Sequence, residues 1–234
     1  MIHLVDPARP GGSPARLRSV RDAFHGDLNQ LGQQLAAMCD AAASAMRDAT
    51  KALLEADLRL AEQVLGADAE LDAKRAECEE LAYSLLALQS PVARDLRIVL
   101  AATYCAQKIE RMGDLAAHIA DTARFTHPEH AVPAELADVF AELGDVAAGM
   151  ADRLAVLVIS PTAGSFAELE EIDCQVDRQH AAVLAKISAV DFEHGPQTAA
   201  SLALVARFYE RFGDQAVSVA KRLDFAATGQ IPTA

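Results

Sequence analysis

The five-residue stretch Glu110-Arg-Met-Gly-Asp114 decides the fold, because it recurs as Glu210-Arg-Phe-Gly-Asp214 one hundred residues later. A second pattern of paired acids precedes each copy, as Asp68-Ala-Glu-Leu-Asp72 and as Asp173-Cys-Gln-Val-Asp177, with an offset of 105 residues. The alanines around the first stretch recur too, with Ala106, Ala116 and Ala120 matched by Ala206, Ala216 and Ala220. Repetition over this length indicates the internal duplication of one structural unit.

Helical periodicity extends outward from these motifs over most of the chain. Apolar residues from Leu17 to Leu53 take ten steps over 36 residues, which is the 3.6-residue period of one helical face. Asp57 is predicted to cap a second helix, and Ser90-Pro91 to supply the N-cap and the first residue of a third. The remaining breaks fall at prolines, which are poorly tolerated inside helices. The six expected helices end near Leu53, Gln89, Phe125, Val158, Val190 and Gly229.

The expected fold class is all-α, with two tandem three-helix bundles related by internal duplication. The first bundle is predicted over residues 16–126 and the second over residues 133–229. Residues 1–15 are rich in Pro and Gly and are expected to form a disordered N-terminal extension. The composition agrees with a helical bundle, because much of the 52% hydrophobic content is Ala and Leu, both strong helix formers.

The composition also excludes several classes of protein. A net charge of −13 opposes nucleic-acid binding, which depends on Lys and Arg neutralising phosphates, and favours basic partner surfaces or cations. No apolar run reaches the roughly 20 residues that cross a bilayer, and no signal peptide is evident, so we expect a cytoplasmic protein without direct membrane insertion. The four cysteines are too far apart for a C-x-x-C pair and are expected to be reduced thiols, at Cys39, Cys78, Cys105 and Cys174.

The paired acids are predicted to meet at the edges of two antiparallel helical hairpins. Residues four apart share one helix face, and residues at the same level of a hairpin have the same index sum. Asp68 with Asp114 and Asp72 with Glu110 have equal sums. The second copy repeats this relation, for Asp173 with Asp214 and Asp177 with Glu210. All eight acids follow the apolar stripe of their helix by one residue, which places them at an accessible edge.

Four like-charged pairs at matched levels favour a bound cation that offsets their repulsion. Carboxylate oxygens are hard ligands that suit Mg, Mn, Ca or Fe. The predicted metal ligands are Asp68, Asp72, Glu110, Asp114, Asp173, Asp177, Glu210 and Asp214. The alternative is a solvated acidic face that is paired with nearby cations, at Arg111, Arg211, Lys74 and Arg178. Gly113 and Gly213 lie in the middle of helices at a cost of roughly 1 kcal/mol each, which indicates close helix approach beside the acids.

The doubled Glu-Arg-x-Gly-Asp motif, preceded by Asp-x-x-x-Asp and by Pro91-Val-Ala-Arg-Asp-Leu-Arg97, resembles the PhoU family of phosphate-uptake regulators. The resemblance covers about residues 16–229 and implies two three-helix bundles with pseudo-twofold symmetry. It implies that the eight acids hold multinuclear metal clusters, of Fe, Zn, Mg or Mn. It also implies a cytosolic negative regulator of phosphate uptake and of the phosphate-starvation response. Such a protein, commonly a homodimer, connects the ATPase subunit of the phosphate ABC transporter with a sensor histidine kinase.

One position departs from the family pattern. His118 stands where the family often has Asn, and the second copy has Ser218 there. His118 is therefore either a further ligand or an exposed or capping histidine, and the two sites can differ in affinity or metal.

Two alternatives to a metal-binding regulator follow from the residues. A carboxylate-bridged metal enzyme of the ferritin type needs Glu-x-x-His on two helices, and the nearest match in this chain is the single Asp177-Arg-Gln-His180. A nucleotide-binding glycine loop and a Ser/His/Asp triad are also lacking, so we expect no enzyme. The sequence shows no evident orthophosphate pocket and therefore does not predict direct phosphate sensing. The other alternative is a metal-free helical scaffold that acts by surface contacts alone.

Overall fold

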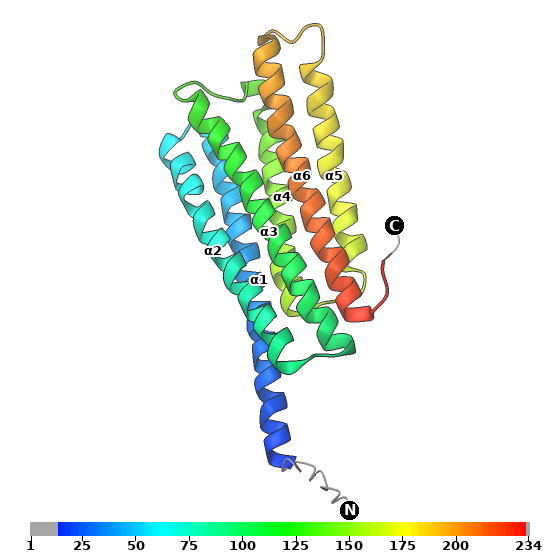
Figure 1. Cartoon of the computed structure of the whole chain (residues 1–234). Helices are drawn as coiled ribbons and strands as arrows, with labels where there is room; N and C mark the ends of the chain where they lie inside the picture. The colour runs from blue at the N-terminus through cyan, green and yellow to red at the C-terminus, as the bar shows by residue number, and fades with distance from the viewer. Residues whose placement is uncertain (1–13, 233–234) are drawn as a thin grey trace, which may run out of the picture.

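The computed structural model describes residues 14–232 of the chain, and every regular element within that range is a helix. The all-α prediction is therefore confirmed. Two sets of three helices follow each other, in the order that the duplication predicts (Figure 1). The six helices are α1 (Pro14–Glu55), α2 (Leu58–Gln89), α3 (Ala93–Thr126), α4 (Ala134–Ile159), α5 (Ser165–Ile187) and α6 (Gly195–Thr228).

Most helix ends lie where the sequence predicts them. Asp57 caps α2 as expected, because the backbone N–H of Leu60 donates a hydrogen bond to its Oδ1 at 3.0 Å. The predicted end of the fifth helix at Val190 is too late, since α5 ends at Ile187. The chain needs the following residues to reverse direction before α6 begins at Gly195, whose φ of 81° is in the left-handed region.

The predicted start of the third helix is wrong. Ser90 is the C-cap of α2, with a left-handed φ of 45°, and α3 begins at Ala93 after an extended Val92. The physical reason lies in Pro91, which has no N–H to donate and cannot continue α2. Ser90 and Pro91 therefore form the turn between the two antiparallel helices, and Val92 takes the N-cap position of α3.

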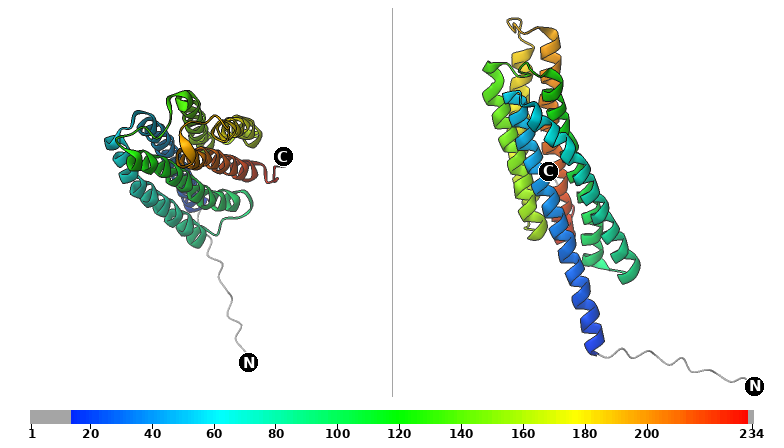
Figure 2. Two further views of the ribbon diagram at one scale, coloured as in Figure 1. Left: turned by 90° about the horizontal axis from the view of Figure 1, so that it is seen from above. Right: turned by 90° about the vertical axis from the view of Figure 1, so that its left-hand side faces the viewer.

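The six helices run side by side along one direction, with the N-terminal part of α1 projecting beyond the end of the bundle (Figures 1 and 2). α1 packs against α4, and α3 packs against α6. α3 and α6 are antiparallel, because Tyr104 of α3 contacts Arg222 of α6 while His118 further along α3 stacks on Phe208 earlier in α6. α1 and α4 are antiparallel too, because Gly32 of α1 lies beside Val158 of α4 and Thr50 lies beside Gly144. α2 flanks α1 and α3 on one side, and α5 flanks α4 and α6 on the other.

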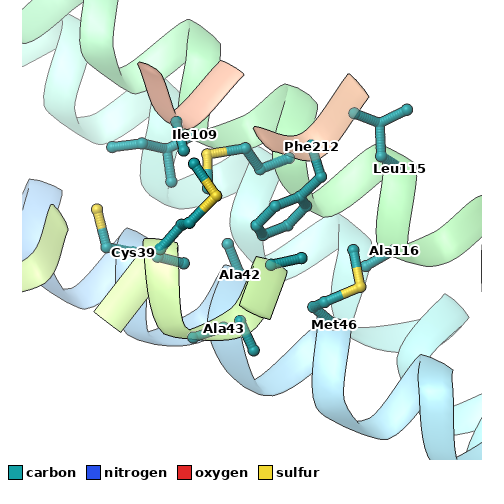
Figure 3. Packing of buried hydrophobic residues seen from close by; sticks show 14 of the residues in the cluster. Cys39, Ala42, Ala43, Met46, Ile109, Leu115, Ala116 and Phe212 are labelled. Carbon is teal, nitrogen blue, oxygen red and sulfur yellow. The ribbon is translucent and has the colours of Figure 1, made fainter. Parts of the chain in front are cut away.

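One continuous hydrophobic core joins both sets of three helices. Met46 of α1, Ile109 of α3 and Phe212 of α6 are each fully buried and pack in the same region (Figure 3). The apolar stripe predicted for the first helix is buried from Leu31 to Leu53. Alanine lines much of the core and allows the helices to approach closely. The predicted boundaries at 16–126 and 133–229 thus describe a sequence repeat whose two copies share a core.

Buried polar contacts fix neighbouring helices against one another at two points, one between the copies and one within the second copy. The hydroxyls of Thr50 in α1 and Tyr209 in α6 are hydrogen-bonded at 2.9 Å. Asp224 in α6 is 5% exposed and accepts hydrogen bonds of 2.9 Å from the backbone N–H of Phe166 and from the hydroxyl of Ser165. These two donors begin α5, so Asp224 fixes the start of α5 against α6.

Three other expectations can be compared with the structure. The disordered extension predicted for residues 1–15 falls mostly outside the described residues, and α1 begins at Pro14. The four cysteines are free thiols, and burial raises the pKa of Cys78 to about 11 and that of Cys105 to about 12. Between residues 14 and 232 no helix combines the length and the apolar character that crossing a membrane requires.

Candidate functional site

The structure places the eight predicted acids on two pairs of packed helices. The first cluster consists of Asp68 and Asp72 on α2 with Glu110 and Asp114 on α3. The second cluster consists of Asp173 and Asp177 on α5 with Glu210 and Asp214 on α6. α2 packs on α3 and α5 packs on α6, so each cluster lies at a helix–helix edge. α2 and α5 lie on opposite sides of the bundle (Figure 1).

The mid-helix glycines allow the close approach that the sequence predicts. A Cβ atom on Gly113 would overlap the side chain of Leu71 and lie 3.9 Å from Oδ1 of Asp68. A Cβ atom on Gly213 would overlap Oδ1 of Asp173 itself. The carboxyl group of Asp173 therefore rests directly on the backbone of α6, in space that only a glycine leaves open.

The acids of the first cluster lie close enough to perturb one another. Burial, followed by the negative charges of Asp114 and Asp72, raises the pKa of Asp68, and His118 opposes the rise. Burial and the same two neighbours also raise the pKa of Glu110, and Arg75 opposes the rise. The level matching predicted from the index sums is thus present in the structure, with Asp68 beside Asp114 and Asp72 beside Glu110.

The second cluster is more tightly enclosed. Burial, then the charges of Asp177, Asp214 and Glu210, raises the pKa of Asp173 to about 7. Burial and the charge of Asp214 raise the pKa of Glu210, whose side chain is 12% exposed. One oxygen of each, Oδ1 of Asp173 and Oε2 of Glu210, is buried without a hydrogen-bond partner. A buried carboxylate oxygen without a donor is costly, and a cation would remove that cost.

Arginines pair with individual acids in both clusters. Arg111 donates to Asp114 at 2.6 Å, as the solvated-face alternative expects. The other partners differ from the expected set, because Arg75 lies 3.8 Å from Asp72 and Arg207 pairs with Glu210. Lys74, Arg178 and Arg211, which the sequence offered, are absent from the ion pairs found between residues 14 and 232.

The clusters offer oxygen ligands of a suitable kind for a metal ion, but their side chains do not point toward one common position. Carboxylate oxygens are the ligands that hard divalent and iron cations prefer, and the orphaned oxygens of the second cluster fit such an ion. No group of three or more His, Cys, Asp or Glu side chains within residues 14–232 has the arrangement that holds a metal. Coordination would therefore require carboxylates now paired with Arg111 or Arg207 to turn toward their neighbours. The metal-ligand role of the eight acids stays a prediction.

His118 lies against the opposite repeat. Its ring stacks on Phe208 of α6, with ring centroids 5.1 Å apart and an angle of 27° between the planes. The side chain is exposed and close enough to Asp68 to lower the pKa of that group. Stacking between the repeats is the role visible in this structure.

Two arginines that pair with acids of their own helix were not predicted from the sequence. Arg75 follows Asp72 by three positions, and Arg207 precedes Glu210 by three. Side chains three apart are neighbours on a helix surface, so the spacing alone could have identified both pairs.

Comparison with known protein families finds a match to the PhoU domain model in both halves of the chain, at residues 35–123 and 140–223. The chain is 42% identical over 213 residues to the phosphate-specific transport system accessory protein PhoU homolog 1 of Mycobacterium leprae, covering 91% of this chain and 96% of that protein. It is equally similar, at 42% over 213 residues, to PhoU homolog 2 of Mycobacterium tuberculosis, covering 91% of this chain and 100% of that protein.

Solved structures show the same fold. The phosphate transport system regulatory protein PhoU of Streptococcus pneumoniae superposes with a TM-score of 0.79 at 23% identity, covering 90% of this chain and 100% of that one. PhoU of Pseudomonas aeruginosa gives the same TM-score and identity, covering 88% of this chain and 100% of that one. The predicted architecture of two related three-helix units is confirmed by these matches.

Proposed function

This chain belongs to the PhoU family, and we propose that it is an accessory protein of a phosphate transport system that represses phosphate uptake when phosphate is plentiful. The observation that carries the proposal is 42% identity over 91% of the chain to a protein named as such an accessory protein. Both family-model matches cover the paired acids, so the proposal extends to the part of the chain that carries the candidate site.

We propose that the protein acts between two partners, the ATPase subunit of the phosphate ABC transporter and a sensor histidine kinase. A net charge of −13 favours binding to basic partner surfaces. The same family membership supports a cytoplasmic location and a homodimer. Sedimentation at several protein concentrations tests the dimer, and a concentration-independent monomer would contradict it.

We propose further that both clusters bind metal ions, of Fe, Zn, Mg or Mn. The support comes from the raised pKa values of Asp68, Glu110 and Asp173 and from the unpartnered oxygens of Asp173 and Glu210. A bound cation would neutralise part of this charge and would tie α2 to α3 and α5 to α6. Because α2 and α5 lie on opposite sides of the bundle, the stiffness of these helix pairs would affect the surface offered to the partners.

A metal-free scaffold is the second candidate function, favoured by the ion pairs of Arg111, Arg75 and Arg207 with the acids. On that reading the arginines already compensate the negative charge, and replacing the acids leaves signalling unchanged. An enzyme receives no comparable support, because relatives are named as accessory or regulatory proteins.

Gene deletion tests the regulatory role. Loss of the protein is expected to raise the expression of phosphate-uptake genes in phosphate-rich medium, and a plasmid copy should restore repression. Unchanged expression in the deletion strain would reject the regulatory assignment.

Metal analysis of protein purified without chelators tests the ligand assignment separately. The double variant Asp114→Ala with Asp214→Ala is expected to lose metal from both clusters. The matched control is Asp121→Ala, which removes an acid from α3 that is paired only with Arg124. Retention of metal by the double variant would show that other residues are the ligands, whereas equal loss from the control would show that the acids act only through net charge.

A further inference from the structure

A small cavity lies between α3, α6 and the C-terminal segment, and none of the eight clustered acids lines it. Its volume is about 210 Å³, and it is lined by Tyr104, Ser218, Lys221, Arg222, Phe225, Ile231 and Pro232. The four α6 residues among these share one helix face by their spacing. The chain after α6 turns back beside the end of the bundle (Figure 1), so Ile231 and Pro232 supply one wall.

Aromatic rings hold the cationic groups at this cavity. The guanidinium of Arg222 lies 4.3 Å from the centroid of the Tyr104 ring, and the ammonium of Lys108 lies 5.5 Å from the same centroid. The ammonium of Lys221 lies 5.0 Å from the ring of Phe166 on α5. Contacts of this kind fix a cation in place without cancelling its charge.

These three cations have no acidic partner in the structure. None of the ion pairs found in residues 14–232 involves Lys108, Lys221 or Arg222. Lys108 donates only to the amide oxygen of Gln215, at 3.0 Å. Lys221 and Arg222 line the cavity with no Asp or Glu among the other lining residues. In a protein with 34 acidic residues and 21 basic ones, this local positive charge favours an anionic ligand.

The duplication supplies an internal comparison. One hundred residues away, the equivalents of Tyr104, Ser218, Lys221, Arg222 and Phe225 are Leu204, His118, Asp121, Thr122 and Phe125. The phenylalanine is kept, but both cations of α6 are replaced, one of them by an acid that is paired with Arg124. Packing between α3 and α6 therefore does not require the cations, because the equivalent half of the same interface is built without them.

We propose that this cavity is a binding site for a phosphoryl group, either free as inorganic phosphate or carried by a small ester. The planar fork of Arg222 matches two phosphoryl oxygens, the ammonium of Lys221 adds a point charge, and the hydroxyls of Ser218 and Tyr104 can donate hydrogen bonds. Ligand cavities for drug-sized molecules are about 300–1,000 Å³, so this smaller cavity suits a small anion. A polyanion is disfavoured by repulsion from the overall charge of −13.

The site uses other residues than the metal clusters and does not depend on the proposed transport role. Binding can be measured on the purified full-length protein alone, so its failure would leave the regulatory proposal unchanged. It would give a phosphate-system accessory protein a direct contact with phosphate or with a phosphorylated metabolite, at a place that no continuous sequence motif marks.

Titration calorimetry with chelator-treated protein tests the proposal with inorganic phosphate, glycerol 3-phosphate and sulfate as probes. Arg222→Gln and Lys221→Gln are each expected to weaken phosphate binding about tenfold or more, since hydrogen bonds to charged groups are the strong ones. Lys51→Gln, which removes an exposed cation from α1, is the matched control and should retain wild-type affinity. A tighter fit of glycerol 3-phosphate than of phosphate would identify an ester as the ligand, and the reverse order would identify free phosphate.

Three results would overturn the assignment: no binding of either phosphoryl probe up to about 10 mM, equal affinities in Arg222→Gln, Lys221→Gln and wild type, or sulfate bound as tightly as phosphate. The variant Asp114→Ala with Asp214→Ala should bind phosphate normally, and loss of binding there would place the anion at a metal cluster instead. Should Arg222→Gln fail to fold without its contact to Tyr104, Lys221→Gln and Ser218→Ala provide the same readout.

Discussion

Replacing Asp173 by Asn is expected to stabilise the metal-free protein at alkaline pH. Asp173 lies against Gly213 among three other acids, and burial followed by their charges raises its pKa from 3.8 to about 7. A carboxyl whose pKa is higher in the folded chain binds more protons when folded than when unfolded. The wild-type protein therefore loses stability as the pH rises from the unfolded pKa toward about 7, and Asn, which has no charge, removes that loss.

The size of the effect follows from the two pKa values. The difference between 3.8 and about 7 corresponds to about 4 kcal/mol, at about 1.4 kcal/mol for each pH unit. Asp173 is only half-buried, so solvent screening reduces this upper limit to about 2 kcal/mol. For a chain of this length, that free energy corresponds to a rise of roughly 4–8 °C in Tm.

Thermal denaturation in chelator measures the difference between wild type and Asp173→Asn at two pH values. The variant should melt higher at about pH 8, and the two proteins should melt nearly together at about pH 4, where Asp173 is protonated when folded. Asp121→Asn is the control: this exposed acid pairs with Arg124, so its loss should not stabilise the protein at either pH. A variant that is equally or less stable than wild type at about pH 8 would refute the reasoning.

Two further predictions concern packing. Gly213→Ala should destabilise the protein by about 1–3 kcal/mol, because the new methyl group overlaps Asp173. The control is Gly149→Ala, at a helical glycine with open space around it, which should be neutral or stabilise the protein by up to about 1 kcal/mol. Equal effects of the two substitutions on Tm would contradict the overlap. Asp224→Ala should cost about 1.5–3 kcal/mol, because the N–H of Phe166 at the start of α5 loses a charged acceptor. Hydrogen exchange should show faster opening of the first turn of α5, and unchanged exchange there would contradict this role.

The helices, and the proximity of the acids within each hairpin, could be predicted from sequence patterns alone. Periodicity identifies the helices, and the index sums of a hairpin place Asp68 beside Asp114 without knowledge of the rest of the fold. Asp57 and the two glycines each follow from the chemistry of one position. These features depend on residues that are close in sequence or are related by one simple turn.

The features that were missed depend on contacts that the hairpins do not define. The turn at Ser90 requires knowledge of how sharply the chain reverses. The cavity beside Tyr104 requires α3 to pack on α6, and nothing in the order of residues states that Arg222 lies over that ring. The packing of one copy against the other could therefore not be predicted from the sequence.

The shared core has a consequence for the origin of the chain. Helices α1 and α3 bury residues such as Met46 and Ile109 partly against α4 and α6 of the other copy. A single ancestral unit of three helices would have left that apolar surface open to water, and large open patches drive association. Such a unit would need a second copy of itself to cover that surface, and joining two copies in one polypeptide meets this need. Once joined, the two halves were free to diverge, as Asp121 and Lys221 have done.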